Sequence, residues 1–338
     1  FKQKTAYEIM PSLVGSEMCI RDRAWAEEGL SEEQLDEIVQ VKGQGIAGLR
    51  FGQERSDEKL GRILAAGFER FDDGILVDVT AADGMEELLE SALRRGWGAV
   101  ISNKKPLVIP LSRYRRLMAM AGRRLRYETT VGAGLPVIAT LRMLLDTGDE
   151  VRHIEGCFSG TLGYLCHCLE EEMDFSAAVR EARALGYTEP DPREDLSGMD
   201  VARKALILAR TLGYELELGD VEVETLFPGE MASLSVDEFM ASLERLDGGY
   251  ERRVAAARQR GCVLRYVAEV EDGHCRVGWR EVDRRDLMAA LRGPDNIVRF
   301  HTARYHANPL TIIGPGAGPE VTAAGVLGDI LALAQQRD

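Results

Sequence analysis

The stretch Ile75–Ser102, ILVDVTAADGMEELLESALRRGWGAVIS, holds two short apolar segments on either side of an amphipathic one. Ile75–Thr80 and Ala99–Ser102 predict strands, and Met85–Leu93 repeats apolar side chains at the spacing of a helix that ends at Gly96. Strand, helix and strand at this spacing form a βαβ unit of a parallel sheet with a right-handed crossover. The stretch therefore predicts half of a doubly wound nucleotide-binding domain.

Upstream of this unit, the sequence should supply the other half of such a domain. The capping box Ser31-x-x-Gln34 predicts one helix, and Leu60–Phe68 predicts a second amphipathic helix. Gly43-x-Gly45-x-x-Gly48 has the spacing of a dinucleotide-binding turn, but a helix-ending loop is the better interpretation because no apolar strand precedes it. We therefore expect residues 24–124 to form an incomplete Rossmann-like domain that lacks its first strand, glycine turn and first helix.

The segment Phe1–Arg23, FKQKTAYEIMPSLVGSEMCIRDR, differs in character from the rest of the chain. It shows no helical or strand period, and it lacks the apolar region of a signal peptide. Leu13–Asp22 back-translates into the transposon-end adapter of sequencing libraries, and Lys2–Glu8 into a flow-cell adapter. We expect residues 1–23 to be a sequencing artefact and the natural sequence before Ala24 to be missing.

Downstream of the βαβ unit, strands and helices interleave with antiparallel pairing. Leu125–Thr130 and Val151–Phe158 predict strands, each followed by a helix. Val263–Val270 and Cys275–Val282 flank a turn whose Asp272-Gly273 pair is a hairpin signal. The fold class predicted is α/β plus α+β, with a mixed second domain over residues 125–308 and a C-terminal strand and helix, residues 309–338, that return to the first domain.

Composition excludes several classes of function. The 338 residues carry 42 Lys and Arg against 56 Asp and Glu, a formal charge of −14, which disfavours nucleic acid as a partner. Apolar runs such as Ala205–Ala209 are far shorter than the roughly 18 residues of a membrane span. A small-molecule substrate fits these properties best.

Cysteine usage points to a reducing, cytoplasmic setting, because the six cysteines lack the spacing of a disulfide framework. Cys166-His167-Cys168 resembles a metal-ligating pair, but no second pair lies nearby in the sequence. The alternative, half-buried residues of a helix, is the better interpretation.

The densest polar constellation is Gly186–Lys204, GYTEPDPREDLSGMDVARK. Two prolines stiffen the loop, Ser197 can cap the helix that follows, and Asp200 and Lys204 lie on one face of that helix. A surface ion pair is the simpler interpretation of those two residues. However, the apolar run Ala205–Ala209 on the same helix places the lysine near the core, where convergent carboxylates and a lysine suit a small zwitterion.

A second cation cluster, Asn103-Lys104-Lys105-Pro106, follows a strand of the parallel sheet. Ligands of open α/β sheets bind at the carboxyl ends of the strands. A ligand-binding turn and a solvated basic turn are equally compatible with this spacing.

Five motifs stand in order along the chain: Ser102-Asn103-Lys104-Lys105, Tyr127–Pro136 (YETTVGAGLP), Phe158–Leu162 (FSGTL), Gly186–Lys204 and Gly316–Gly325 (GAGPEVTAAG). Together, over residues 28–338, they resemble homoserine dehydrogenase, and in particular the dehydrogenase half of bifunctional aspartokinase–homoserine dehydrogenases. The departure from the family pattern is the missing glycine-rich turn that would hold the dinucleotide pyrophosphate.

The resemblance implies an activity, the interconversion of L-homoserine and L-aspartate 4-semialdehyde in threonine, methionine and isoleucine biosynthesis. It implies that Lys204 is the proton donor for the developing alkoxide, and that Lys104 lies between nicotinamide and substrate. It also implies that Glu189, Asp195 and Asp200 bind the homoserine ammonium and orient the catalytic lysine.

The same resemblance implies two bound groups. The cofactor is NADP or NAD, and its implied contacts are Thr80, Lys104, Gly186, Glu189 and Gly318. A monovalent cation, usually sodium, is implied at the carbonyls around Glu128, Val131, Ala133 and Leu135. Oxygen ligands suit such a hard ion.

The implied assembly is a homo-oligomer, dimer or tetramer, held through a catalytic and dimerisation domain over residues 125–308. The resemblance further implies an aspartokinase domain upstream. The alternative is a catalytically silent fragment that folds and dimerises without binding the dinucleotide, because the helix N-terminus that would hold the pyrophosphate is missing.

Overall fold

The computed structural model describes residues 72–293 and 295–336, and before them the isolated positions Arg23, Ala24, Glu33, Asp36, Gln40, Arg50 and Phe51. Contacts divide the chain into two compact units, Phe1–Gly134 with Gly318–Asp338, and Leu135–Ala317. The adapter-like residues 1–22, most of the helix predicted after Ser31, the glycine turn at 43–48 and the helix at 60–68 lie outside the described residues. Among the described residues, no helix is long and apolar enough to cross a membrane.

The first unit contains the predicted βαβ unit. Strands β3 (Ile75–Asp78) and β4 (Gly98–Ile101) pair in parallel, and helix α4 (Met85–Arg94) connects them. The backbone N–H of Gly96, at φ +87°, donates to Leu93, and this closes the helix as the glycine predicts. The prediction of a parallel sheet in this region is confirmed.

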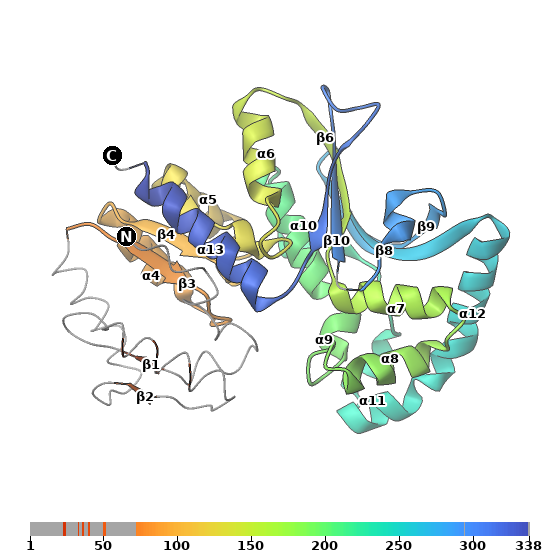
Figure 1. The fold of residues 1–338 in the computed structure, drawn as a ribbon. Helices are drawn as coiled ribbons and strands as arrows, with labels where there is room; N and C mark the ends of the chain where they lie inside the picture. Colours follow the sequence, from red (N-terminus) through yellow and green to blue (C-terminus); the bar gives the residue numbers. More distant parts are fainter. Residues whose placement is uncertain are drawn as a thin grey trace. The chain divides into compact units, whose positions relative to one another are not determined.

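Helices cover this sheet. Helix α5 (Leu111–Ala121) contacts α4, and helix α13 (Pro319–Ala334) contacts β4. Val100 of β4 packs in one buried cluster with Val326 and Leu333 of α13. Each fully buried aliphatic side chain of this kind contributes about 1.5–3 kcal/mol. The C-terminal helix is therefore an integral part of the first unit (Figure 1).

The strand predicted over Leu125–Thr130 is wrong beyond its first two residues. Strand β5 (Leu125–Arg126) pairs with β4, and the chain then turns into the 3₁₀ helix η3 (Glu128–Thr130). The N–H of Glu128 donates to Asp329 Oδ2 of α13 at 2.9 Å, across 201 residues of sequence. The backbone N–H of Glu128, which a longer strand would have paired with a neighbouring strand, thus bonds the distant side chain of Asp329.

The second unit is built on a mixed sheet of six strands in the order β11-β10-β6-β8-β9-β7. Its strands are β6 (Val151–Cys157), β7 (Glu222–Val223), β8 (Cys262–Glu271), β9 (His274–Asp283), β10 (Asp295–Thr302) and β11 (Leu310–Pro315). All neighbouring pairs are antiparallel except β7 with β9. Asp272 and Gly273 form the predicted hairpin turn with φ +48° and +78°. With the parallel sheet of the first unit, this sheet confirms the predicted α/β plus α+β class.

The helices of the second unit connect and cover these strands. They are α6 (Val137–Asp146), α7 (Gly160–Glu170), α8 (Phe175–Ala184), α9 (Arg193–Leu196), α10 (Met199–Thr211), α11 (Val236–Ser242) and α12 (Glu244–Gln259). The 3₁₀ turns are η4 (Leu218–Asp220), η5 (Gly229–Ser233) and η6 (Leu287–Ala290) here, and η1 (Lys105–Leu107) and η2 (Gly122–Arg124) in the first unit. Helices α7, α10 and α12 all contact β8 (Figure 1).

The domain boundaries in the structure differ from those expected. Along the chain, the boundaries between the units fall at residues 134/135 and 317/318, whereas the sequence predicts domain boundaries at 124/125 and 308/309. Strand β11, which we had grouped with the first domain, pairs with β10 over six residue pairs instead. Its register with the second sheet assigns it to that unit, and only the helix after it belongs to the first.

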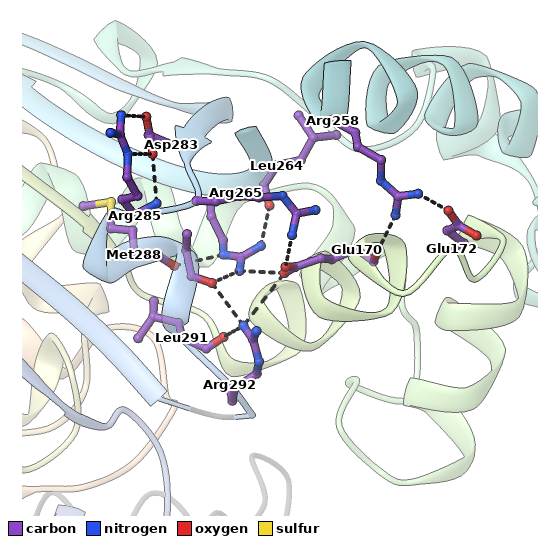
Figure 2. A network of polar contacts seen from close by, with 12 residues as sticks. Glu170, Glu172, Arg258, Leu264, Arg265, Asp283, Arg285, Met288, Leu291 and Arg292 are labelled. Carbon is purple, nitrogen blue, oxygen red and sulfur yellow. Dashed lines mark hydrogen bonds and ion pairs between the residues drawn. The ribbon is translucent and has the colours of Figure 1, made fainter. Parts of the chain in front are cut away.

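A buried ion-pair network ties the last turn of α7 to the sheet. Arg265 of β8 is 3% exposed and bonds Glu170 at 3.0 Å and the carbonyl of Met288 at 3.0 Å (Figure 2). Arg284 and Arg292 approach the same carboxylate. Because a guanidinium presents five donors in a rigid fork, one arginine fixes both α7 and η6 against β8.

Candidate active site

Polar side chains gather at the carboxyl ends of β3 and β4, where open parallel sheets bind their ligands. Asp78 and Asn103 are buried, and Asn103 Nδ2 donates to Asp78 Oδ2 at 3.1 Å and to the carbonyl of Ala82 at 2.9 Å. Thr80 donates to Asp78 Oδ1 through both its N–H, at 3.0 Å, and its hydroxyl, at 2.7 Å. Thr80, a predicted cofactor contact, is therefore held rigidly at this edge.

The two lysines that follow β4 differ in their surroundings. Lys104 is half-buried and directly precedes the turn η1. Lys105 pairs with the exposed Asp83 at 2.8 Å. Both lysines are half-buried, and the N–H of Lys105 donates to Asn103 Oδ1 at 3.1 Å. The ion pair of Lys105 with the exposed Asp83 contributes little to stability.

The glycine-rich turn after η3 packs directly against the first turns of α13. A Cβ atom at Gly134 would lie 2.0 Å from the carbonyl oxygen of Val321, and one at Gly325 would lie 2.6 Å from Thr129 Cγ2. Gly132 and Ala133 have φ values of +79° and +53°. The motifs YETTVGAGLP and GAGPEVTAAG therefore meet in space, because glycine allows the two backbones to approach each other.

In the second unit, Lys204 lies where β6 ends and α7 begins. Its Nζ donates to the carbonyl of Phe158 at 2.6 Å and pairs with Asp200 Oδ2 at 2.8 Å. The lysine side chain is 12% exposed and the aspartate 43%. The prediction that both residues share one helix face is confirmed, and the contact with Phe158 excludes a purely surface pair.

The loop after α8 is built from its own polar groups and from α7. Thr161 Oγ1 of α7 donates to the carbonyl of Tyr187 at 2.6 Å, and the N–H of Glu189 donates to Asp195 Oδ2 at 2.8 Å. Glu189 itself is exposed. Gly186, at φ +73°, begins the loop in a conformation that favours glycine.

Three of the predicted carboxylates act on one another: Glu189 of this loop, Asp195 of α9 and Asp200 of α10. Burial raises the pKa of Asp195 above its ordinary value of 3.8, and the negative charges of Glu189 and Asp200 raise it further. Hydrogen bonds from Glu189 and Thr161 oppose the shift. A cation placed among these carboxylates would relieve their mutual repulsion, which is the electrostatic requirement for binding an ammonium group.

Two local predictions need correction or qualification. Ser197 is not the N-cap residue of α10, which is Gly198 at φ +73°. Its hydroxyl nevertheless accepts from the N–H of Met199, the first residue of α10, at 3.2 Å, and it donates to the carbonyl of Glu194 at 2.8 Å. The sequence predicts a loop here, but residues Arg193–Leu196 form the short helix α9. Ser197 follows α9 directly, and its hydroxyl bonds a carbonyl of that helix. Cys166 and Cys168 are buried side chains of α7, so the interpretation as helix residues is confirmed.

The carbonyls assigned to the cation divide between the two units, with Leu135 in the second and the others in the first. Glu128 O accepts from the N–H of Val131 at 3.4 Å, and Leu135 O accepts from Val137 at 2.8 Å. A carbonyl oxygen has a second lone pair, so both remain chemically able to ligate a hard ion.

Comparisons with known proteins bear on the family of this chain. The family model described as homoserine dehydrogenase matches residues 136–331. The homoserine dehydrogenase of Emericella nidulans is 44% identical over 273 residues, which cover 76% of this chain and 74% of that protein. The chain belongs to the homoserine dehydrogenase family. These matches do not favour the alternative of a catalytically silent fragment that folds without binding the dinucleotide.

Two further relatives add detail. The bifunctional aspartokinase/homoserine dehydrogenase 2 of Zea mays, a chloroplastic protein, is 47% identical over 270 residues, or 78% of this chain. The chain spans only 29% of the length of that relative. A hyperthermophilic archaeal homoserine dehydrogenase in complex with NADPH superimposes with a TM-score of 0.65 at 25% identity, covering 90% of this chain and 83% of that one.

Sequence reasoning missed the residues that position the predicted ones. Asp78 and Asn103 order the edge that holds Thr80, while Phe158 and Thr161 hold Lys204 and the loop. The motif FSGTL, which contains Phe158 and Thr161, indicated a function only as part of the resemblance to the family. A backbone carbonyl that accepts from a lysine 46 residues away has no signature in the sequence.

Proposed function

We propose that this protein interconverts L-homoserine and L-aspartate 4-semialdehyde with NADP(H) or NAD(H). The observation that carries the proposal is the position of Lys204, an almost buried ammonium held between Asp200 and the Phe158 carbonyl. Family membership supplies the reaction, and this lysine supplies the group that can move a proton.

Lys204 is proposed as the proton donor and acceptor. An ammonium has three N–H donors, and Asp200 and Phe158 accept two of them, so the third can bond the substrate oxygen. Donating a proton to an oxygen that becomes an alkoxide stabilises the charge that develops there. Lys104 is proposed to assist from the edge of the parallel sheet.

Glu189, Asp195 and Asp200 are proposed to bind the substrate ammonium. The support is the repulsion among these carboxylates, which raises the pKa of Asp195. Because Asp200 also holds Lys204, we assign it the further role of orienting the lysine. A ligand without an ammonium group would leave this repulsion uncompensated.

The proposed cofactor contacts are Thr80, Lys104, Gly186, Glu189 and Gly318. The fit is supported by the ordered polar edge of β3 and β4, where Asp78 fixes Thr80. When bound, the nicotinamide supplies or accepts the hydride. The protein's own residues fix the position of the cofactor and keep a charged lysine near the substrate.

Further assignments rest on the family. A monovalent cation, sodium in the first instance, is proposed at the carbonyls of Glu128, Val131, Ala133 and Leu135. We also propose a fused aspartokinase, a homo-oligomer and a cytoplasmic location, with the five described cysteines all free as a reducing compartment requires.

Turnover of a substrate panel tests the proposal. Reduction of NADP⁺ and NAD⁺ at 340 nm is followed with L-homoserine, L-serine, L-threonine and 4-hydroxybutyrate, the last lacking the ammonium group. We expect homoserine to be oxidised at least about 100-fold faster than 4-hydroxybutyrate, as expected for a charged contact of roughly 3 kcal/mol. Equal rates with 4-hydroxybutyrate would overturn the role of the carboxylates, and no turnover of homoserine would overturn the function.

A further inference from the structure

A compact group of two histidines and a glutamate lies on the sheet of the second unit. His153 and Glu155 belong to β6, and His301 belongs to β10. One nitrogen or oxygen atom from each of the three lies within 4.8 Å of the other two. Among the described residues, this is the single group of His, Cys, Asp and Glu side chains with the geometry to hold a metal ion.

Strand register brings the group together. His301 stands directly opposite His153 in the antiparallel pair, and their rings stack with centroids 5.0 Å apart. Glu155, two residues along β6, projects from the same face, because side chains of a strand alternate. The register shifts between His301 and Thr302, and such bulges re-aim the side chains beside them.

The ligand atoms are suited to a metal. His153 Nε2 is buried and has no hydrogen-bond partner, and His301 Nε2 lies 3.1 Å from Glu155 Oε1. Glu155 is buried and accepts hydrogen bonds from the guanidiniums of Arg280 and Arg299. A buried imidazole nitrogen without a partner destabilises the fold, and a bound ion would give this nitrogen a partner.

The neighbouring arginines do not exclude a cation. Arg280 bonds Glu155 but also Glu269, at 2.7 Å, and Arg299 bonds Glu155 but also Asp286. In this contact network, the three carboxylates of Glu155, Glu269 and Asp286 outnumber the two guanidiniums, so the network carries a net negative charge when the imidazoles are neutral. A divalent ion therefore meets a favourable local field.

We propose that His153, Glu155 and His301 form a zinc-binding site that ties β6 to β10. Two imidazoles, one carboxylate and a water complete the four ligands that zinc prefers. The role is structural, because β6 continues from this site to Phe158, whose carbonyl holds Lys204. At roughly 3.3 Å per residue, His153 lies five residues, or about 16 Å, along the chain from that carbonyl.

The test is metal binding to the purified protein, with Zn²⁺ and with Co²⁺ as a spectroscopic probe. After treatment with a chelator and dialysis, we expect about one equivalent of Zn²⁺ per chain and visible absorption of tetrahedral Co²⁺ without thiolate charge transfer near 350 nm. The double variant His153→Gln/His301→Gln should bind zinc roughly 100-fold more weakly or worse. The matched control His306→Gln, an exposed histidine, should bind like the parent.

Circular dichroism checks that each variant is folded. The single variant His301→Gln replaces the double variant if the double variant does not fold. Zinc should also raise the Tm of the parent protein but not that of the histidine variant. Less than about 0.2 equivalents of zinc in the parent, or thiolate charge transfer with cobalt, would overturn the site. Unchanged affinity in a folded histidine variant would overturn it equally.

Discussion

The two regions that carry the family motifs hold their shape by different forces. In the first unit, the turn Val131–Gly134 meets α13 through glycines, and backbone approaches backbone. In the second unit, Lys204 and its carboxylates are held by charges and hydrogen bonds. Adding a side-chain atom at the glycines of the first region should therefore cause a steric clash, whereas the second region should be sensitive to substitutions that change charge. Substitutions should separate stability in the first region from chemistry in the second.

The largest expected effect is on chemistry. Lys204→Ala should lower kcat of the full-length protein roughly 10²–10⁴-fold, because it removes the proposed proton donor. The Tm should change little, since Asp200 is 43% exposed and remains solvated. Steady-state kinetics measures this, with Arg203→Ala on the same helix as control. A kcat within about twofold of the parent would show that the acid–base assignment is wrong.

The second effect is on packing. Gly325→Ala should destabilise the protein by about 1–3 kcal/mol, because the new Cβ would lie 2.6 Å from Thr129 Cγ2 and 3.1 Å from Gly134 Cα. Gly328→Ala, three residues along the same helix, meets no atom within 4 Å and should stabilise by about 0.5–1 kcal/mol. Urea unfolding of both variants gives the comparison. Equal stability of the two would contradict the steric explanation.

A third effect is on substrate binding. Glu189→Ala should raise KM for homoserine about tenfold with kcat nearly unchanged, because an exposed carboxylate contributes a ground-state contact to the ammonium. The control is Glu194→Ala, an exposed carboxylate of the neighbouring helix α9. If kcat falls instead and KM does not move, Glu189 acts in the chemical step and the division of roles is wrong.

The smallest effects concern pH and distinguish two aspartates of one loop. Asp191 has a lowered pKa because Arg193 bonds it, so its contribution to stability is present above pH 3.8 and is lost as pH falls. Asp195 has a raised pKa because of burial, so its contribution is present below pH 3.8 and is lost as pH rises through the folded-state pKa. The two groups should therefore have opposite pH dependences.

Asn substitutions measure this difference. Asp191→Asn should lose about 1 kcal/mol or less at pH 7 and almost nothing near pH 3. Asp195→Asn should gain stability relative to the parent as the pH rises from about 3 to 7. Urea unfolding of each variant and the parent across this range is the measurement. The same sign of pH dependence in both variants would refute the electrostatic account of the loop.

Local patterns predicted much of this fold, and the one strand that was predicted too long shows where they fail. The βαβ unit, the Gly96 helix end and the Asp272-Gly273 hairpin depend on residues that are close in sequence, and all three are present. The strand predicted to Thr130 failed because Asp329 takes the backbone donor of Glu128. Such a partner, 201 residues away, leaves no trace in the local pattern.

The same division holds for the candidate site. Helical spacing placed Asp200 and Lys204 on one face, and the structure joins them at 2.8 Å. The spacing could not show that the lysine reaches the carbonyl of Phe158, and this contact distinguishes a largely buried lysine from one in a surface ion pair. The glycines of the first unit likewise predicted a turn but not what packs against it.

By itself, the sequence determined the βαβ unit, the Asp272-Gly273 hairpin, which residues share a helix face, and the family to which the chain belongs. These properties follow from periodicity, capping and motif order, all of which are local or additive along the chain. Only the tertiary structure decided that β11 joins the second sheet, that Gly134 lies against Val321, and that His301 stands opposite His153. Such pairings depend on strand register and close packing between distant segments, and a shift of one residue would reverse the face on which each side chain lies.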